Sequence, residues 1–225
     1  MANVIKIKKG LDINLKGKAS DVLLNGGKSD TYAIVPDYYN GIVPKVVAKV
    51  GEKVKAGSVL MIDKNRPEIK FVSPVSGEVT AVNRGEKRKV LSVVVKPEAQ
   101  VEYEDFGKKN LASLKREEVK EAIQQAGMWP FIKQRPYDIV ASPADEPRDI
   151  FVSAFYSAPL APNFDFIVKG QEADFQAGLD ALAKLTDGKV YVGIRKGSSV
   201  SVKGVETVEV EGPHPAANVG VQINH

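Results

Sequence analysis

The chain has 225 residues, of which 43% are hydrophobic and 27% charged, enough for one large or two small globular domains. Its lack of cysteine excludes disulfides, thiolate nucleophiles and cysteine-bound zinc or iron–sulfur clusters. We expect no transmembrane helix and no secretory signal, because no run approaches about 18 apolar residues and the N-terminus has no apolar signal region.

The chain has a net charge of +4, but its two halves differ in the sign of their charge. Residues 1–100 contain 18 Lys and Arg against 10 Asp and Glu, a charge of +8. Residues 101–225 contain the remaining 14 and 18, a charge of −4. This asymmetry predicts two domains, residues 1–100 and residues 101–225.

The first domain reads as a series of short strands. Residues 4–7 alternate apolar and polar side chains and predict the strand on which this domain opens, and residues 10–17 repeat the pattern. Asn25-Gly26-Gly27 predicts a turn. Residues 33–36 and 42–46 flank a predicted loop of turn-forming and aromatic residues at 36–41.

Residues 44–97 carry the most specific pattern of the chain. The order G-x-x-V-x-x-G-x-x-L, from Gly51 to Leu60, is followed by S-P-x-x-G-x-V, from Ser73 to Val79, and by a strand at 90–95. Short strands at close, regular spacing predict a small barrel or sandwich. The two motifs in this order resemble the barrel-sandwich hybrid of lipoyl and biotinyl carrier domains.

Carrier domains of that kind bear a modified lysine at the tip of the hairpin between the two motifs. Counting back from Ser73-Pro74 places that position near Arg66, and Pro67 stiffens the turn. Lys64 lies nearby, so a carrier with a modified Lys64 stays an alternative. We expect Lys64 to be an ordinary solvated lysine.

One turn concentrates positive charge. Residues 84–89 read Arg-Gly-Glu-Lys-Arg-Lys, and we expect a solvated turn between two strands. No stacking aromatic accompanies it, which disfavours nucleic-acid binding.

The second half begins with a linker at residues 98–110 and a helix. Ser113 suits the N-cap of that helix, and Gly127 its C-terminal stop. The helix presents an apolar stripe formed by Val119, Ala122, Ile123 and Ala126. Trp129 follows, and we expect it to be buried against Phe131 and this stripe.

The remainder alternates strands with a helix. Residues 150–155, 189–194 and 205–210 predict strands, and residues 171–186 predict a helix between the first two. Strand–helix–strand at this spacing predicts a βαβ unit with parallel pairing, and so a Rossmann-like α/β domain. The last residues predict no closing element, and we expect the sequence to be part of a longer protein.

No group of residues forms a persuasive catalytic constellation. The chain has neither G-x-G-x-x-G nor G-x-x-x-x-G-K-[ST], and residues 193–199 are either an anion-binding loop or an ordinary strand exit. His214 and His225 have no partners at metal-ligand spacing. Ser76 lacks the G-x-S-x-G context of a nucleophile, and residues 145–148 read as a solvated loop. We therefore assign no catalytic, cofactor-binding or metal residue.

The whole chain resembles the N-terminal half of the A-subunit family of sodium-translocating NADH:quinone reductases. The resemblance rests on the opening IKIKKGLD at 5–12, the motifs of 44–97, Trp129-Pro130-Phe131, and the closing GPHPAANVG at 212–220. More distantly, the chain resembles the C-subunit of the Rnf complex and the FMN- and NADH-binding subunit of respiratory complex I.

The flavin-binding relatives have a glycine-rich loop and an acidic segment that this chain lacks. The loop position reads Gly127-Met128-Trp129-Pro130-Phe131, and the acidic position reads VSAFYSAP at 152–159. The resemblance therefore implies a flavin fold without flavin in this chain. A flavin-binding electron-transfer subunit resembling the Rnf C-subunit stays an alternative.

The resemblance implies a peripheral hydrophilic subunit on the cytoplasmic side of the cell membrane. Its role would be assembly, with a part at the quinone end of the complex. FMN, FAD, riboflavin and iron–sulfur centres would be carried by partner subunits, with NADH and quinone as substrates. Membrane contact would be made through those partners, and no nucleic acid is expected.

Overall fold

The computed structural model describes residues 3–17 and 19–225. The chain forms two compact units, residues 26–145 and residues 1–25 together with 146–225. Contacts thus group residues 101–145 with the β-rich part and residues 1–25 with the α/β part. The sequence-based boundary at residue 100 is a different division and stays a prediction.

The unit of residues 26–145 is built on two antiparallel sheets, in the order β2-β8-β7-β4 and β3-β5-β6. The strands are β2 (Tyr32–Ile34), β3 (Pro44–Val46), β4 (Lys53–Val54), β5 (Val59–Asp63), β6 (Lys70–Val72), β7 (Gly77–Arg84) and β8 (Val90–Pro97). Alternate residues of β7 and β8 point inward, and Val79, Val93 and Val95 are fully buried with Leu60. The predicted barrel-sandwich hybrid is confirmed.

Gly77 of the second motif is needed for a close approach between two strands. Gly77 has φ +156°, and a Cβ at this position would collide with the carbonyl oxygen of Lys96 on β8. Only glycine permits the two strands to approach so closely at the start of β7.

The segment after β8 packs onto the same unit and is not a free linker. Ala56 bonds to the backbone of Glu102 and Glu104 on either side of Tyr103. Beyond it lie η3 (Leu111–Ser113), α1 (Arg116–Gln125), η4 (Trp129–Phe131) and the short hairpin β9 (Lys133–Gln134) and β10 (Ile139–Val140).

The start of α1 differs from the prediction, whereas its end agrees. Ser113 is not the N-cap, because it closes a 3-10 turn and its hydroxyl donates to Asn110 O at 2.9 Å. The helix starts after Lys115, whose N–H donates to the Glu118 carboxylate at 2.8 Å. Gly127 ends it with φ +68°, in the double hydrogen-bond pattern of a Schellman motif.

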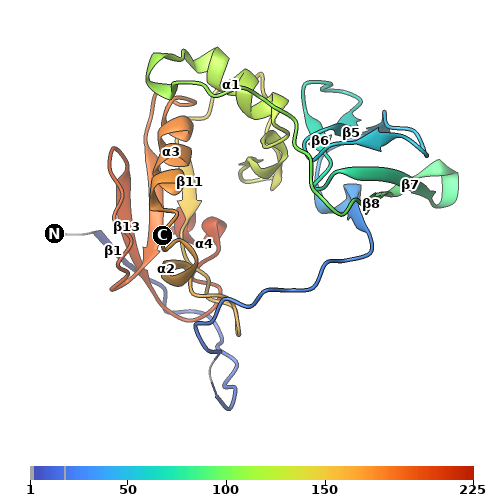
Figure 1. The fold of residues 1–225 in the computed structure, drawn as a ribbon. Coiled ribbons are helices and arrows are strands. Elements are labelled where there is room, and N and C mark those ends of the chain that lie inside the picture. Colours follow the sequence, from blue (N-terminus) through green and yellow to red (C-terminus); the bar gives the residue numbers. More distant parts are fainter. Residues whose placement is uncertain (1–2, 18) are drawn as a thin grey trace. The chain divides into compact units, whose positions relative to one another are not determined.

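The other unit is built on one parallel sheet in the order β1-β13-β12-β11 (Figure 1). Its elements are β1 (Asn3–Lys6), β11 (Ile150–Ser153), α2 (Phe164–Ile167), α3 (Glu172–Ala183), β12 (Val190–Arg195), β13 (Glu206–Glu211) and α4 (Val219–Asn224). The predicted βαβ unit and mixed α/β fold are confirmed. The strand at residues 4–7 forms, but it pairs with β13 and does not open the β-rich domain.

The two faces of this sheet are covered differently. Leu179 of α3 packs on Val190, Val192 and Ile194 of β12. On the opposite face Phe151 and Tyr191 stack with their ring centroids 5.0 Å apart. The short helix α4 contacts β11, so the chain has a closing helix where none was predicted.

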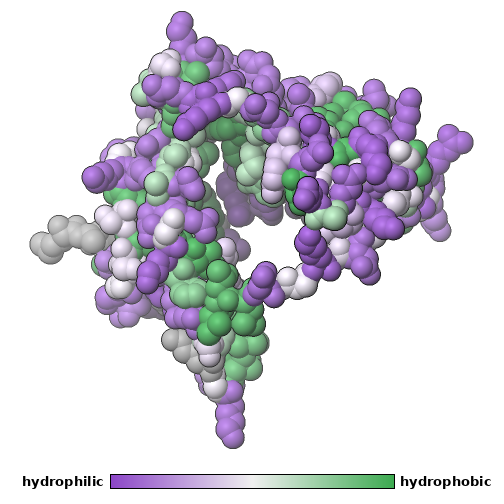
Figure 2. Space-filling model, in the orientation of Figure 1, coloured by the Kyte–Doolittle hydropathy of each residue, from purple (hydrophilic) through white to green (hydrophobic). Residues whose placement is uncertain are grey.

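The segment between β1 and β2 contains no strand in its described residues, 7–17 and 19–31. The predicted strand at 10–17 does not form, because Leu11 N donates to His214 O and Asp12 accepts from His214 N. The structure has no turn at residues 25–27, where one was predicted. The apolar side chains of Leu11, Leu23 and Leu24 in the segment between β1 and β2 are exposed. Figure 2 shows hydrophobic surface on the loop at the bottom of the view.

Candidate functional site

The first candidate is the hairpin that would carry a modified lysine. Lys64 is exposed in the turn after β5, where its backbone N–H donates to Val43 O at 2.7 Å. Among the described residues its ammonium group has no ion-pair partner within 4 Å. This is the geometry expected of a solvated lysine.

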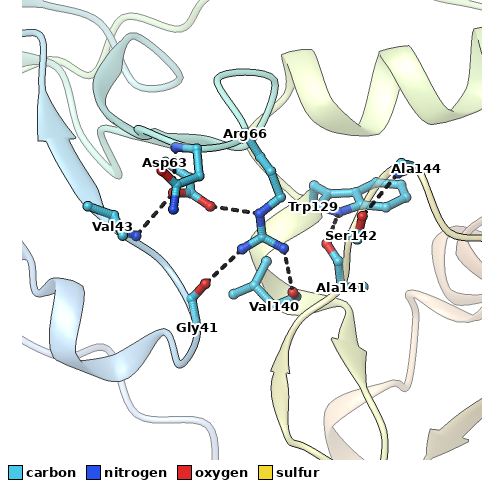
Figure 3. Close-up of polar contacts among 10 residues, drawn as sticks. Gly41, Val43, Asp63, Arg66, Trp129, Val140, Ala141, Ser142 and Ala144 are labelled. Carbon is cyan, nitrogen blue, oxygen red and sulfur yellow. Dashed lines mark hydrogen bonds and ion pairs between the residues drawn. The ribbon is translucent and has the colours of Figure 1, made fainter.

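Arg66, near the carrier position, points into the unit (Figure 3). Its Nε donates to Asp63 Oδ2 at 2.8 Å, and Asp63 is fully buried. Its two terminal nitrogens donate to the carbonyls of Gly41, at 2.9 Å, and Val140, at 3.1 Å. Asp63 in turn accepts the backbone N–H of Val43 at 3.0 Å. A permanently charged guanidinium in such a cluster cannot be acylated, so the residue near the usual carrier position cannot bear the group.

Trp129 is buried, as predicted, with 5% of its surface exposed. It lies on η4, and its indole N–H donates to Ala141 O at 2.9 Å (Figure 3). Phe131, its predicted packing partner, is 65% exposed and meets the ring of Tyr39 edge-on, with the ring centroids 6.2 Å apart.

The flavin loop of the distant relatives has no counterpart with room for a flavin. At Gly127 a Cβ would clash with the side chain of Val72, so the space beside the backbone is already filled. The indole of Trp129 is buried two residues further on. The residues present do not fit FMN at this position.

The second candidate is a cavity of about 390 Å³ at the carboxyl edge of the parallel sheet. Ligands of α/β proteins bind at this edge, because the loops that follow the strands converge there. The cavity is lined by Asp12, Phe155, Ser157, Arg195, Lys196, Val210, Glu211 and Gly212. Its acidic and basic side chains balance, and Lys196 pairs with Glu211 at 2.9 Å.

A serine and a histidine meet beside this cavity. Ser157 Oγ lies 3.1 Å from His214 Nδ1 and accepts the N–H of Ala217 at 3.0 Å. Asp12 accepts the backbone N–H of His214 at 2.8 Å, so it does not orient the imidazole as the acid of a catalytic triad does. The bonds tie the chain segments around residues 12, 157 and 214 together, and they indicate a structural role.

The loop after β12, the anion-binding candidate, holds the chain's own carboxylate. Asp165 of α2 accepts from Ser198 Oγ at 2.7 Å, from Ser199 N at 2.8 Å and from Ser199 Oγ at 3.2 Å. Burial raises the pKa of Asp165, but the hydrogen bonds of both serines and the charge of Arg195 outweigh it and hold this pKa below its ordinary value. Sequence reasoning found the loop but missed Asp165, because 33 residues separate it from Ser198.

The other candidate residues from the sequence make structural contacts. Ser76 is buried, and its hydroxyl accepts the N–H of Glu102 at 2.8 Å. Arg148 pairs with its neighbour Asp149 at 2.8 Å. Within residues 3–17 and 19–225, no three His, Cys, Asp or Glu side chains gather at metal-binding distance.

Arg195 lines the cavity. Among the described residues, no carboxylate lies within 4 Å of its guanidinium group. Its Nη2 donates to Tyr156 O at 2.6 Å, and its guanidinium lies 5.9 Å from the centre of the Phe155 ring. The remaining donors could hold one small polar group, but the geometry offers no reacting pair of side chains.

Family models match both halves of the chain. Residues 5–98 match the NqrA N-terminal barrel-sandwich hybrid domain, and residues 114–225 match the NqrA second alpha/beta domain. The barrel-sandwich hybrid model precedes the alpha/beta model along the chain, in the same order as the β-rich and α/β parts of the fold.

Curated relatives are similar over almost the whole chain. The A-subunit of the Na(+)-translocating NADH-quinone reductase of Vibrio atlanticus (strain LGP32) is 40% identical over 228 residues, which cover 99% of this chain and 51% of the relative. The same subunit from Neisseria meningitidis serogroup A / serotype 4A (strain DSM 15465 / Z2491) is 37% identical over 226 residues, covering 98% and 51%. The chain therefore spans about half the length of these relatives.

None of the helices in the described residues is long and apolar enough to cross a membrane. The two domain models in order, the relatives at 37–40% identity and the confirmed fold lead to one assignment. The chain belongs to the NqrA family, that of the A-subunits of the Na(+)-translocating NADH-quinone reductases.

Proposed function

We propose that this chain is part of a peripheral, hydrophilic subunit of a respiratory complex that couples NADH oxidation and quinone reduction to sodium export. The observation that carries the proposal is the ordered match to both NqrA domains. We also propose that these domains divide the sequence near residue 100. The matched ranges 5–98 and 114–225 support that boundary.

The role of the chain in that complex is assembly and positioning, with a part at the quinone end. Three features support the absence of catalytic, cofactor-binding and metal residues. Arg66 is held in a buried ion pair, the indole of Trp129 is buried beside the flavin-loop position, and Asp165 fills the loop after β12. At each of these three places a side chain of this protein occupies the position that a bound group would need.

The redox groups lie in the partner subunits under this proposal. FMN, FAD, riboflavin and iron–sulfur centres belong to those partners, which also bind NADH. The subunit sits on the cytoplasmic side of the cell membrane and reaches the membrane through its partners. Its hydrogen-bonded sheets would hold the contacting surface against them.

Deletion of the subunit in the native host tests the proposal. Membranes from the deletion strain should oxidise NADH with an artificial acceptor but lose sodium-dependent reduction of quinone. Expression of the subunit from a plasmid should restore it. Full NADH-to-quinone activity in the deletion strain would show that the subunit is dispensable, and the proposed role would be wrong.

A further inference from the structure

The turn between β7 and β8 has an unusual backbone for its residues. Lys87 has φ +51° and ψ +30°, and Arg88 has φ +61°. The N–H of Lys89 closes the turn on Glu86 O at 3.0 Å, and the N–H of Gly85 donates to Lys89 O at 2.8 Å. Two successive left-handed residues inside such a closed turn are the mark of a type I′ hairpin turn.

The residues that normally occupy this turn are different. Asn-Gly and Asp-Gly are strongly preferred at its two central positions, because Asn and Gly enter the left-handed region most easily. Lys and Arg are disfavoured there by contact between Cβ and the backbone. A hairpin that needs only to connect two strands gains nothing from Lys87 and Arg88 at these positions. Backbone strain of this kind is concentrated at sites that bind.

In the described part of the chain, the two strained residues are the cations of this turn whose side chains have no hydrogen-bond or ion-pair partner. Arg84 donates to Arg88 O at 3.1 Å, and Lys89 pairs with Asp37 at 2.7 Å. Among the described residues, no carboxylate lies within 4 Å of the charged groups of Lys87 or Arg88. Both side chains are exposed, and the turn that carries them closes the β7–β8 hairpin (Figure 1).

An apolar side chain stands beside this charged tip. Leu91 is 42% exposed and packs against Gly85, where a Cβ would lie 3.3 Å from it. A rigid turn thus presents two adjacent free cations and one leucine. Protein interfaces pair such a desolvated apolar contact with charged neighbours that set orientation.

We propose that the tip formed by Lys87, Arg88 and Leu91 docks on an acidic face of another polypeptide, a partner subunit of the complex. The inference rests on the proposed function and adds the surface and its chemistry. Guanidinium pairs with carboxylate in a fixed, two-bond geometry, which suits a turn that is already rigid. Anionic lipid surfaces instead attract clusters of roughly four to eight free cations, and this tip has two.

The strain provides a variant that separates folding from binding. Lys87→Asn with Arg88→Gly supplies the preferred type I′ pair, so it should melt at or above the temperature of the parent chain. It removes both free charges. Lys108→Asn with Lys109→Gly is the matched control, because these adjacent exposed lysines belong to the same compact unit and lie in irregular chain.

The test is a binding titration on two kinds of membrane. The labelled chain is added to membranes from a strain that lacks the subunit but makes the others, and to protein-free vesicles of lipids extracted from the same strain. Thermal melts are recorded for every variant. We expect the parent and the control to bind the membranes alike, with an affinity that falls as salt rises. The tip variant should bind at least about tenfold more weakly and with less salt dependence.

The outcomes are distinct. Equal binding by the tip variant and the parent would overturn the inference and leave the proposed function standing. Equal weakening of the tip and control variants would overturn it as well, since charge alone would then explain binding. Tip-dependent binding to the protein-free vesicles would identify a lipid partner and also overturn it. If the parent does not bind membranes that contain the other subunits, the inference is overturned, whereas the proposed function is decided by the deletion strain.

Discussion

The two compact units each hold one carboxylate where a related fold could hold a ligand, and they hold it by opposite means. Asp63 is fully buried and is matched by the charge of Arg66. Asp165 is half-buried and is bound mainly by neutral donors of Ser198 and Ser199. A buried charge needs an opposite charge because desolvation is costly, whereas a partly solvated one needs only hydrogen bonds.

The same contrast extends to what each cluster secures. The Asp63–Arg66 pair ties the β5–β6 hairpin to the carbonyls of Gly41 and Val140. Asp165 ties the short helix α2 to the loop after β12. Substitution in the first cluster should therefore disturb a core, and substitution in the second only the attachment of a loop.

Trp129→Gly should have the largest effect. Loss of the buried indole leaves a cavity and an unpaired Ala141 carbonyl, and should cost about 3–5 kcal/mol in unfolding of the 26–145 unit. It should not restore FMN binding, because Val72 still fills the space beside Gly127. Urea unfolding and flavin titration measure both effects. Phe131→Gly on the same turn is the control and should lose far less; FMN binding at micromolar levels would show an intact flavin site behind the tryptophan.

Arg66→Ala should cost nearly as much. It leaves Asp63 buried without its cation, a change worth about 3 kcal/mol. Asp63→Asn combined with Arg66→Ala should be less destabilised than the two single variants added together, because the double variant has no unpaired charge. Chemical unfolding of all three variants gives the coupling. Strict additivity would mean that the ion pair does not stabilise the hairpin.

Asp165→Asn should have a smaller, pH-dependent effect. The amide loses charge-assisted hydrogen bonds to two serines, a loss of about 1–2 kcal/mol near neutral pH. Because the pKa of Asp165 is lowered on folding, its stabilisation is present above the ordinary carboxyl pKa and is lost as the pH falls through the lowered value.

The difference between parent and Asp165→Asn should therefore shrink in acid, as unfolding at a series of pH values would show. Asp21→Asn, at an exposed position of the same unit, is the control and should show no such trend. A constant difference at every pH would contradict the role given to the carboxylate.

Lys64→Arg should have the smallest effect. The side chain is exposed and without an ion-pair partner among the described residues, so stability should change by less than about 0.5 kcal/mol. Intact mass of the protein from its native host should equal the mass of the unmodified chain. A lipoyl or biotinyl adduct on Lys64 would contradict this prediction, because the hairpin would then carry a prosthetic group.

Local patterns account for the elements that sequence reasoning found. The spacing of Gly51, Val54, Gly57 and Leu60 predicted the β-rich unit, and Gly127 predicted the end of α1. The apolar face of α3 and the strands around it predicted the βαβ unit. Each signal depends on residues a few positions apart, within the reach of backbone propensity and side-chain periodicity.

The sequence by itself determined the two architectures and the loss of flavin and carrier motifs, because composition and short-range spacing carry that information. Only the tertiary structure decided that β1 pairs with β13, that Asp63 and Arg66 close a core with Val140, and that Asp165 fills the loop at Ser198. These contacts join residues tens to hundreds of positions apart. A strand or a carboxylate has many chemically equivalent partners in the sequence, and packing of the whole chain selects one of them.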